Sequence, residues 1–195
     1  MFKIIEDISQ FLLKHPTKTY AFRDTSTIDK IVVHQTDTED QGKFTAYNIA
    51  NYHVNNNDWA GIGYHYLITD DGSIFKTNDE DKISYHASGY NSRSIGVAIT
   101  GDHTIGSDNY DIVDKKKYNA LVYLLAKLCN NYNLNVSDII GHNETGSPKS
   151  CPNLNMDQLR ADVKKKRIYL WIAKGIIVGL LIALLIYLGK KIKII

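Results

Sequence analysis

The chain has 195 residues, with 23 Lys and Arg against 21 Asp and Glu, a formal net charge of +2. This length suits one compact domain with an appendage, and two cysteines provide no disulfide framework. Residues 1–163 hold 15 basic and all 21 acidic residues, a net charge of −6, whereas residues 164–195 hold eight basic residues and no acid. The acidic domain lacks the clustered Lys and Arg that bind phosphate backbones, which argues against nucleic acid as its partner.

The first segment has no signal-peptide character, because Glu6 and Asp7 interrupt its apolar residues. Those apolar residues recur at helical spacing instead. We therefore expect residues 1–27 to form an amphipathic helix and a lead-in, packed on the domain that follows. The apolar positions are Ile4, Ile5, Ile8, Phe11 and Leu12.

Apolar runs alternate with polar breaks through residues 28–163, which we take as the domain. Short strands are predicted at 31–33, 64–69, 73–76, 94–100 and 139–140, with a turn at 70–72 joining the second and third. Helices are predicted at 44–54, at 118–132 and from Met156, where Asn155 is the expected N-cap. Interleaved strands and helices without a repeat predict an α/β domain with a mixed central β-sheet flanked by helices.

Two features of the predicted long helix have a structural interpretation. Cys129 lies on its apolar stripe and is expected in the core. The run Lys115, Lys116, Lys117 is expected to be a solvated helix start.

Two histidines and a cysteine follow predicted strands in a pattern that suits zinc. His34 ends one strand, His142 follows another, and Cys151 comes nine residues later beside a proline. Imidazole nitrogen and thiolate sulfur both bind this ion, and three protein ligands leave a fourth position open, as in catalytic sites. The spacing alone is weak evidence, since a single histidine is more often a core or surface residue.

Four ordered segments strengthen this hypothesis by resemblance. They are residues 31–34 (IVVH), 61–66 (GIGYHY), 86–97 (from HASGYN to SIGV) and 141–152 (from GH to KSCP). Their order resembles the N-acetylmuramoyl-L-alanine amidases that are related to short phage lysozymes and peptidoglycan recognition proteins. The resemblance implies that His34, His142 and Cys151 hold Zn²⁺ and that Tyr64 and Lys149 assist catalysis. It further implies a peptidoglycan hydrolase that cleaves the amide bond between N-acetylmuramic acid and L-alanine, with host lysis as a phage-type endolysin its expected role.

The chemistry of these residue types agrees with those roles. Amide hydrolysis needs an activated water, a stabilised oxyanion and a protonated leaving nitrogen. Lys149 offers a cation for the oxyanion, and the Tyr64 hydroxyl can position water or pass a proton. Glu144, two residues after His142, remains an alternative base.

The remaining candidates concern substrate binding. His86 lies in the segment that resembles the family and is predicted to line the groove for peptidoglycan. Asn91 and Arg93, with Ser94 beside them, are candidates for contacts with the substrate carboxylates. Arg93 offers a fork suited to carboxylates, although surface placement explains it equally well. His65 alternates with Tyr64 along a strand and is predicted to be structural.

Three other functions compete with the amidase hypothesis. One is a protein that binds peptidoglycan without cutting it, and the presence of Tyr64, Lys149 and Cys151 counts against it. Another is a cysteine hydrolase that pairs Cys151 with His142, which leaves His34 unexplained. A bacterial wall-remodelling amidase is the third. We expect the protein to act as a monomer.

Residues 164–195 form a basic linker followed by an apolar segment. Residues 168–189 contain one charge, Lys174, and are predicted to anchor the protein by a single C-terminal transmembrane helix. Basic residues are in modest excess before the segment, which favours the domain on the cytoplasmic side of the host inner membrane until the membrane is breached.

Overall fold

The computed structural model describes residues 3–104, 106 and 113–192, and their side chains except those of 174 and 177–192. Within these residues six strands form one sheet in the order β1-β4-β3-β5-β2-β6. The strands are β1 (Ile5–Asp7), β2 (Lys30–Gln35), β3 (Tyr66–Ile68), β4 (Ile74–Lys76), β5 (Ser94–Ile99) and β6 (Ile139–Gly141). The helices are α1 (Lys43–Asn55), α2 (Lys115–Asn131) and α3 (Met156–Ile192), with short 3-10 turns at Ser9–Phe11, Thr25–Thr27, Val136–Asp138 and His142–Thr145.

The sheet is mixed, as predicted. The hairpin β3–β4 is antiparallel, whereas β1–β4, β3–β5, β5–β2 and β2–β6 pair in parallel. In β2, Val33 pairs with both Val97 of β5 and Gly141 of β6. The carboxyl ends of these three strands therefore meet at one edge of the sheet, where the polar residues that follow them come together.

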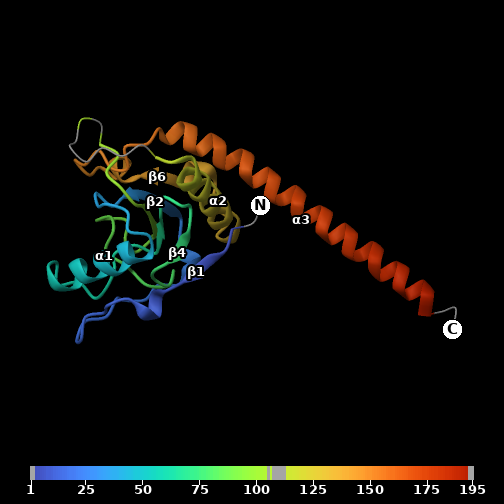
Figure 1. Cartoon of the computed structure of the whole chain (residues 1–195), viewed down its shortest axis with the longest axis horizontal. Coiled ribbons are helices and arrows are strands. Elements are labelled where there is room, and N and C mark those ends of the chain that lie inside the picture. Colours follow the sequence, from blue (N-terminus) through green and yellow to red (C-terminus); the bar gives the residue numbers. More distant parts are fainter. Residues whose placement is uncertain (1–2, 105, 107–112, 193–195) are drawn as a thin grey trace.

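Helices cover both faces of the sheet (Figure 1). Alternate strand residues such as Val97 and Ala98 point to opposite faces, because side chains alternate along a strand. Val97 belongs to the larger core with α2 and the start of α3. Ala98 belongs to the smaller core, which α1 and the N-terminal segment complete. The predicted α/β arrangement with flanking helices is confirmed, as are the buried Cys129 and the predicted N-cap, because Asn155 Oδ1 accepts from Gln158 N at 2.9 Å.

The N-terminal segment differs from its prediction. Ile5–Asp7 forms an edge strand paired with β4 instead of a helix, and Ile8 N–H continues the pairing to Lys76 O at 3.0 Å. Ile8 is buried, but Ile4 is 89% exposed, so the helical spacing of apolar residues does not describe one buried stripe. Pairing with an open sheet edge satisfies the backbone here and overrides the local helical pattern.

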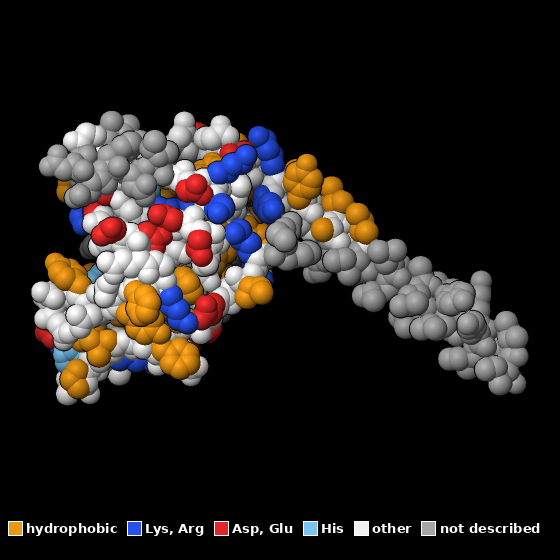
Figure 2. All heavy atoms as spheres, viewed as in Figure 1, with side chains coloured by type: hydrophobic (Ala, Val, Ile, Leu, Met, Phe, Trp, Pro, Cys, Tyr) orange, Lys and Arg blue, Asp and Glu red, His pale blue; other side chains and the backbone are white. Residues whose placement is uncertain are grey.

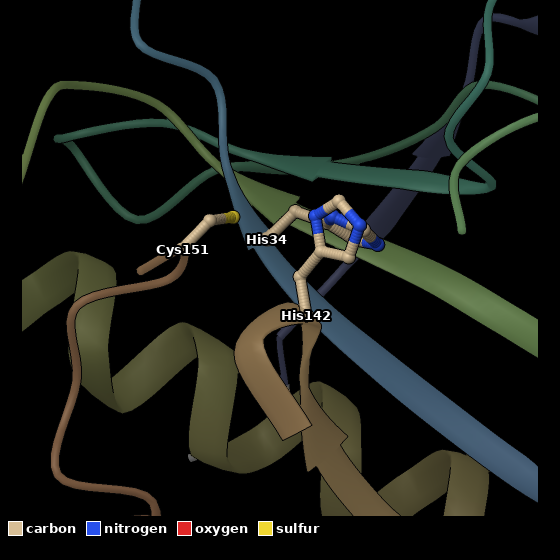
Figure 3. A group of neighbouring side chains, drawn as sticks. All are labelled: His34, His142 and Cys151. Atoms are coloured by element: carbon tan, nitrogen blue, oxygen red, sulfur yellow. The ribbon is translucent and has the colours of Figure 1, made fainter. Parts of the chain in front are cut away.

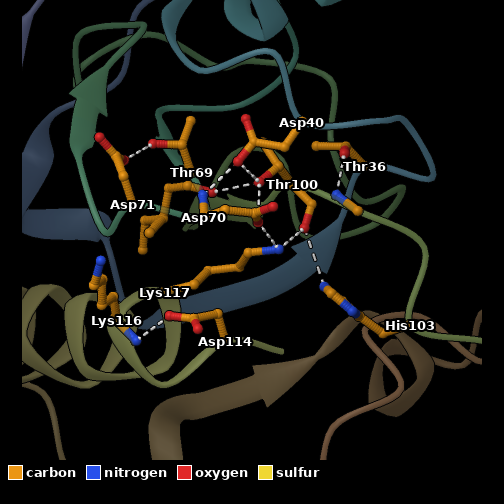
Figure 4. Close-up of polar contacts among 12 residues, drawn as sticks. Thr36, Asp40, Thr69, Asp70, Asp71, Thr100, His103, Asp114, Lys116 and Lys117 are labelled. Atoms are coloured by element: carbon orange, nitrogen blue, oxygen red, sulfur yellow. Dashed lines mark hydrogen bonds and ion pairs between the residues drawn. The ribbon is translucent and has the colours of Figure 1, made fainter. Parts of the chain in front are cut away.

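The predicted solvated lysine run is wrong for one of its members. Lys115 and Lys116 are exposed, but Lys117 is 0% exposed. Its Nζ forms an ion pair with Asp70 and donates to Thr100 O at 2.6 Å (Figure 4). Asp114 caps the helix by accepting from Lys116 N. Lys117 lies on the buried face of α2 together with Leu121 and Leu124, which explains why it points inward.

The predicted C-terminal transmembrane helix is also corrected. Among the described residues, no helix is long and apolar enough to cross a bilayer, which contradicts the span at 168–189 and the membrane localisation inferred from it. Charge spacing gives the physical reason: 15 uncharged residues separate Lys174 from Lys190, and they cover only about 22 Å of helix against a hydrocarbon core of about 30 Å. Much of this segment, residue 174 and residues 177–195, lies outside the described side chains.

The described start of α3 nevertheless has an unusual surface. Leu170 still packs against the larger core, and the C-terminal part of α3 projects from the domain (Figure 1). Hydrophobic side chains are exposed on the described part of the helix where it leaves the domain (Figure 2). Trp171 is 77% exposed and Tyr169 71% exposed. Over the domain itself, acidic and basic side chains are interspersed on the face shown in Figure 2.

Candidate metal centre and active site

His34, His142 and Cys151 converge at the carboxyl edge of the sheet (Figure 3). His34 is the fifth residue of β2, and His142 directly follows β6, the parallel neighbour of β2. One ligand atom from each of the three residues lies within 4.8 Å of the others. The parallel pairing of β2 and β6 thus brings together residues that are more than a hundred positions apart.

The geometry of this trio fits a zinc ion. Tetrahedral Zn–N bonds of about 2.0 Å and Zn–S bonds of about 2.3 Å place ligand atoms roughly 3.3 to 3.6 Å apart. Donor atoms within 4.8 Å of one another reach that spacing by side-chain shifts of about 1 Å. Two imidazoles and one thiol are a donor set that zinc prefers, and three ligands leave one position for water.

The electrostatics of the trio favour neutral imidazoles. Burial lowers the pKa of His34 well below its usual value, and His86, His142 and Lys149 lower it further. Burial and Lys149 also lower the pKa of His142. An unprotonated imidazole is the form that binds a metal, so both histidines are ready to act as ligands.

Cys151 is a buried thiol in this environment. Burial raises its pKa to about 11, against an opposing hydrogen bond from Gln35 N–H to the sulfur at 3.3 Å. The thiol therefore needs a strong positive charge, such as a divalent cation, to ionise at neutral pH.

Gln35 supports the loop that carries Cys151, a role that we did not predict from the sequence. It is 4% exposed, and its Oε1 accepts from Asn153 Nδ2 at 3.0 Å and from His103 N at 3.2 Å. Its Nε2 donates to Thr104 Oγ1 at 3.1 Å. A polar amide directly after a ligand, inside an otherwise apolar strand, is the signal that points to such a residue.

Tyr64 and Lys149 both line a cleft of about 630 Å³ beside the trio. The Tyr64 ring lies 5.3 Å from the His34 ring between centroids. Burial raises the pKa of Tyr64, and nearby Cys151 and Asp37 raise it further. The phenol therefore stays protonated and acts as a hydrogen-bond donor. Loop 36–41 and one face of α1 form the other cleft walls.

His53 is a second residue that supports the site, and no feature of the sequence indicates its role. Its Nδ1 accepts from Gly63 N at 3.0 Å, one residue before Tyr64, and its ring lies 5.8 Å from that of Tyr64. At Gly63 a Cβ atom would come within 2.8 Å of Tyr85 O and 2.9 Å of Trp59, so only glycine fits. The predicted motif at 61–66 thereby places the Tyr64 ring.

The three predicted substrate-binding residues lie elsewhere. None of His86, Asn91 and Arg93 is among the described residues that line the cleft. Arg93 forms a forked ion pair with Asp29 at the surface. Asn91 Oδ1 accepts from the backbone N–H groups of His86 and Ala87. His86 contacts His34, with its Nδ1 3.1 Å from His34 Nε2.

Two other candidates have structural partners. Glu144 accepts from Gly141 N at 2.8 Å and from Arg160 at 3.0 and 3.1 Å, and the Arg160 hydrogen bond lowers its pKa. This carboxylate therefore braces the His142 turn against α3. His65 is fully buried, and its Nδ1 accepts from Gly96 N at 3.0 Å, in agreement with its predicted structural role.

Comparisons with known proteins agree with this geometry. Residues 24–154 match the family model of N-acetylmuramoyl-L-alanine amidases. The endolysin of Escherichia phage T7 is 31% identical over 144 residues, covering 69% of this chain and 87% of the relative, and that of Enterobacteria phage T3 is 30% identical over the same shares.

Solved structures show the same fold. The Ph2119 endolysin of a Thermus scotoductus bacteriophage superposes with a TM-score of 0.64 at 25% identity, covering 82% of this chain and 99% of that one. Bumblebee PGRP-SA superposes with a TM-score of 0.67 at 22% identity, covering 82% and 95%. By its sequence match over two thirds of its length, the chain belongs to the N-acetylmuramoyl-L-alanine amidase family.

Proposed function

We propose that this protein is a zinc-dependent N-acetylmuramoyl-L-alanine amidase that uses His34, His142 and Cys151 as metal ligands. The observation that carries the proposal is the convergence of these three side chains within 4.8 Å, beside a cleft that Tyr64 and Lys149 line. Its substrate is the amide bond between N-acetylmuramic acid and L-alanine in peptidoglycan, the bond for which the family is named.

Each residue at the cleft has a distinct task in that hydrolysis. When bound, zinc supplies Lewis-acid activation of the attacking water and of the scissile carbonyl. Lys149 lines the cleft together with Tyr64, and its cation is the charge that would stabilise the oxyanion of the tetrahedral intermediate. The protonated Tyr64 phenol donates a hydrogen bond at the same centre, to the oxyanion or to the attacking water.

The cleft binds the substrate on both sides of the cut bond. Its volume of about 630 Å³ is large enough for several sugar or amino-acid units. Thr45, Asn48 and Tyr52 project from one face of α1 into it. Hydroxyl and amide groups suit the hydrogen bonds of a glycan or peptide, and the exposed Tyr52 ring offers a stacking surface.

Two phage endolysins among the relatives support host lysis as the biological role. A thiol hydrolase is disfavoured, because burial raises the pKa of Cys151 and because His34 would have no task. Peptidoglycan-recognition proteins are also relatives, so binding without cleavage is an outcome that the test must detect.

Metal analysis of the purified chain tests the proposal. We expect one zinc per chain, a loss of zinc in Cys151→Ala, and retention in Cys129→Ala, which removes the other thiol from the core. Removing zinc with a chelator should abolish hydrolysis, and restoring zinc should recover it. Full activity after complete zinc removal, or stoichiometric zinc in a folded His34→Ala, Cys151→Ala double variant, would contradict the proposal.

A further inference from the structure

A buried histidine contacts His34, one of the three proposed ligands. His86 is 7% exposed and His34 is 1% exposed, and His86 Nδ1 is 3.1 Å from His34 Nε2. The two rings meet edge to face with centroids 5.2 Å apart. One of the two nitrogens must carry the proton and the other must accept it, so this contact constrains the tautomers of both rings.

Hydrogen bonds link His34, His86 and Ser94 in a chain that ends at the carbonyl of Tyr90, and this carbonyl fixes their directions. Tyr90 O is a carbonyl and can only accept, so the Ser94 hydroxyl donates to it at 2.7 Å. With its proton used, Ser94 Oγ accepts from His86 Nε2 at 3.3 Å. His86 Nδ1 is then without a proton and accepts from His34 Nε2–H. His34 Nδ1 is consequently the nitrogen with a lone pair, the form that can bind a metal.

The surrounding backbone is shaped to hold the His86 ring in this place. Asn91 Oδ1 accepts from the N–H groups of His86 and Ala87 at 3.0 and 2.8 Å, which fixes the loop that carries the ring. A Cβ atom on Gly96 would come within 2.6 Å of His86 Cγ, so the ring occupies the space that a side chain would need. Gly96 pairs in register with Val32, two residues before His34, which places this space beside the ligand.

From these contacts we propose that His86 is a positioning residue, which holds His34 in the tautomer that presents Nδ1 to the metal. Ser94 sets the tautomer of His86 in turn, and Asn91 and Gly96 seat its ring. The inference rests on the proposed metal site and explains why residues 86–96, which lie off the cleft, form one of the motifs of the chain. Such partners of metal-bound histidines commonly change metal affinity by about 10-fold to 100-fold when removed.

The tautomers can be read directly by ¹⁵N NMR of the histidine side chains in the metal-free, full-length protein. We expect protonated Nε2 and bare Nδ1 in both His34 and His86, with His34→Asn and His86→Asn used to assign the signals. A proton on Nδ1 of His34 would overturn the inference. This reading requires no catalysis, so it stands apart from the outcome for the amidase activity.

The zinc affinities of His86 variants distinguish a positioning role of His86 from a role in packing alone. His86→Phe keeps an aromatic ring but accepts no hydrogen bond, and we expect zinc to bind about 10-fold to 100-fold more weakly. His86→Asn places an amide oxygen close to where Nδ1 lies, so it should restore most of that loss. Equal zinc affinity of the wild type and a folded His86→Phe, or no rescue by His86→Asn, would overturn the inference.

A milder variant covers the case in which His86→Phe does not fold. Ser94→Ala keeps the contact between the two rings but removes the acceptor for His86 Nε2–H. We expect a mixture of His86 tautomers in its NMR spectrum and weaker zinc binding than in the wild type. A single unchanged tautomer together with unchanged zinc affinity would show that Ser94 has no part in positioning.

Discussion

The backbone N–H of Gln35 donates a hydrogen bond to the sulfur of Cys151 at 3.3 Å, across 116 positions of sequence. Strand β2 therefore presents one of the proposed ligands, His34, and contacts a second one, Cys151, through the residue that follows. The Gln35 side chain also accepts a hydrogen bond from Asn153, and it thereby holds the loop that carries Cys151. The geometry of the proposed metal centre thus depends on a residue outside the proposed ligand set.

Replacing Gln35 with alanine should lower stability and weaken zinc binding. The Asn153 amide and the His103 N–H would lose a buried acceptor, which costs roughly 2 to 4 kcal/mol in unfolding free energy. Urea denaturation of the metal-free protein measures this loss. Gln41→Ala, at an exposed position of the cleft rim, is the control and should stay within about 0.5 kcal/mol. Equal stability of the two variants would contradict the role assigned to Gln35.

Tyr64→Phe and Lys149→Ala should each retain zinc and slow turnover by ~10² to 10³. Each change removes a group that acts mainly on the transition state, so substrate affinity should survive. The control Tyr47→Phe removes a phenol from α1 outside the cleft lining and should leave kcat unchanged. Near-normal kcat in both Tyr64→Phe and Lys149→Ala would move catalysis to other residues.

The convergence of His34, His142 and Cys151 was predictable because parallel strands bring their carboxyl ends to one edge, and because the order of four motifs resembled a known family. The hairpin was predictable from its turn at 70–72. The residues that support these three side chains were not predictable from the sequence. His86 contacts His34 across 52 positions of sequence. No local pattern distinguishes a histidine that lines a groove from one that packs against another histidine.

Two errors of prediction have a shared cause in tertiary contacts. The segment Ile5–Asp7 pairs with β4, a partner that its own helical spacing cannot reveal. Lys117 follows two solvated lysines, and only the folded chain places Asp70 and Thr100 O around its ammonium group. The prediction of a membrane span at 168–189 is wrong for another reason: it required Lys174 to lie at the membrane interface, and without that the uncharged stretch is too short.

Lys117→Met should destabilise the domain by about 1.5 to 3 kcal/mol, since the buried Thr100 O loses a charged donor and the half-exposed Asp70 loses its ion-pair partner. Asp70 and its neighbour Asp40 would then face each other without this cation (Figure 4). Lys116→Met, one residue earlier and exposed, should change stability by less than about 0.5 kcal/mol. Urea denaturation of both variants decides, and a Lys117→Met protein as stable as Lys116→Met would contradict the structure.

The domain should lose stability in mild acid because of His65. Burial, with Arg23 nearby, lowers the pKa of His65 to about 3. The unfolded chain binds this proton near pH 6.5, so it gains protons first as the pH falls and stability decreases. Between pH 7 and pH 5 the loss amounts to about 2 kcal/mol.

The variant His65→Asn isolates this contribution, because its amide oxygen can still accept from Gly96 N–H but does not titrate. Urea denaturation at pH 7 and pH 5 in the presence of a chelator should show a pH-dependent loss about 2 kcal/mol smaller in His65→Asn than in the wild type. The same loss in both proteins would place the acid sensitivity elsewhere.

The most direct test of the proposed function is to identify the bond that the protein cleaves in peptidoglycan. Purified peptidoglycan sacculi are digested with the zinc-loaded full-length protein, and the released fragments are identified by mass spectrometry. The proposed amidase activity predicts free stem peptides with an L-alanine amino terminus, intact glycan strands with unsubstituted N-acetylmuramic acid, and no release by the chelator-treated protein. Fragments cut within the glycan or between amino acids, or binding to sacculi without any release, would contradict it.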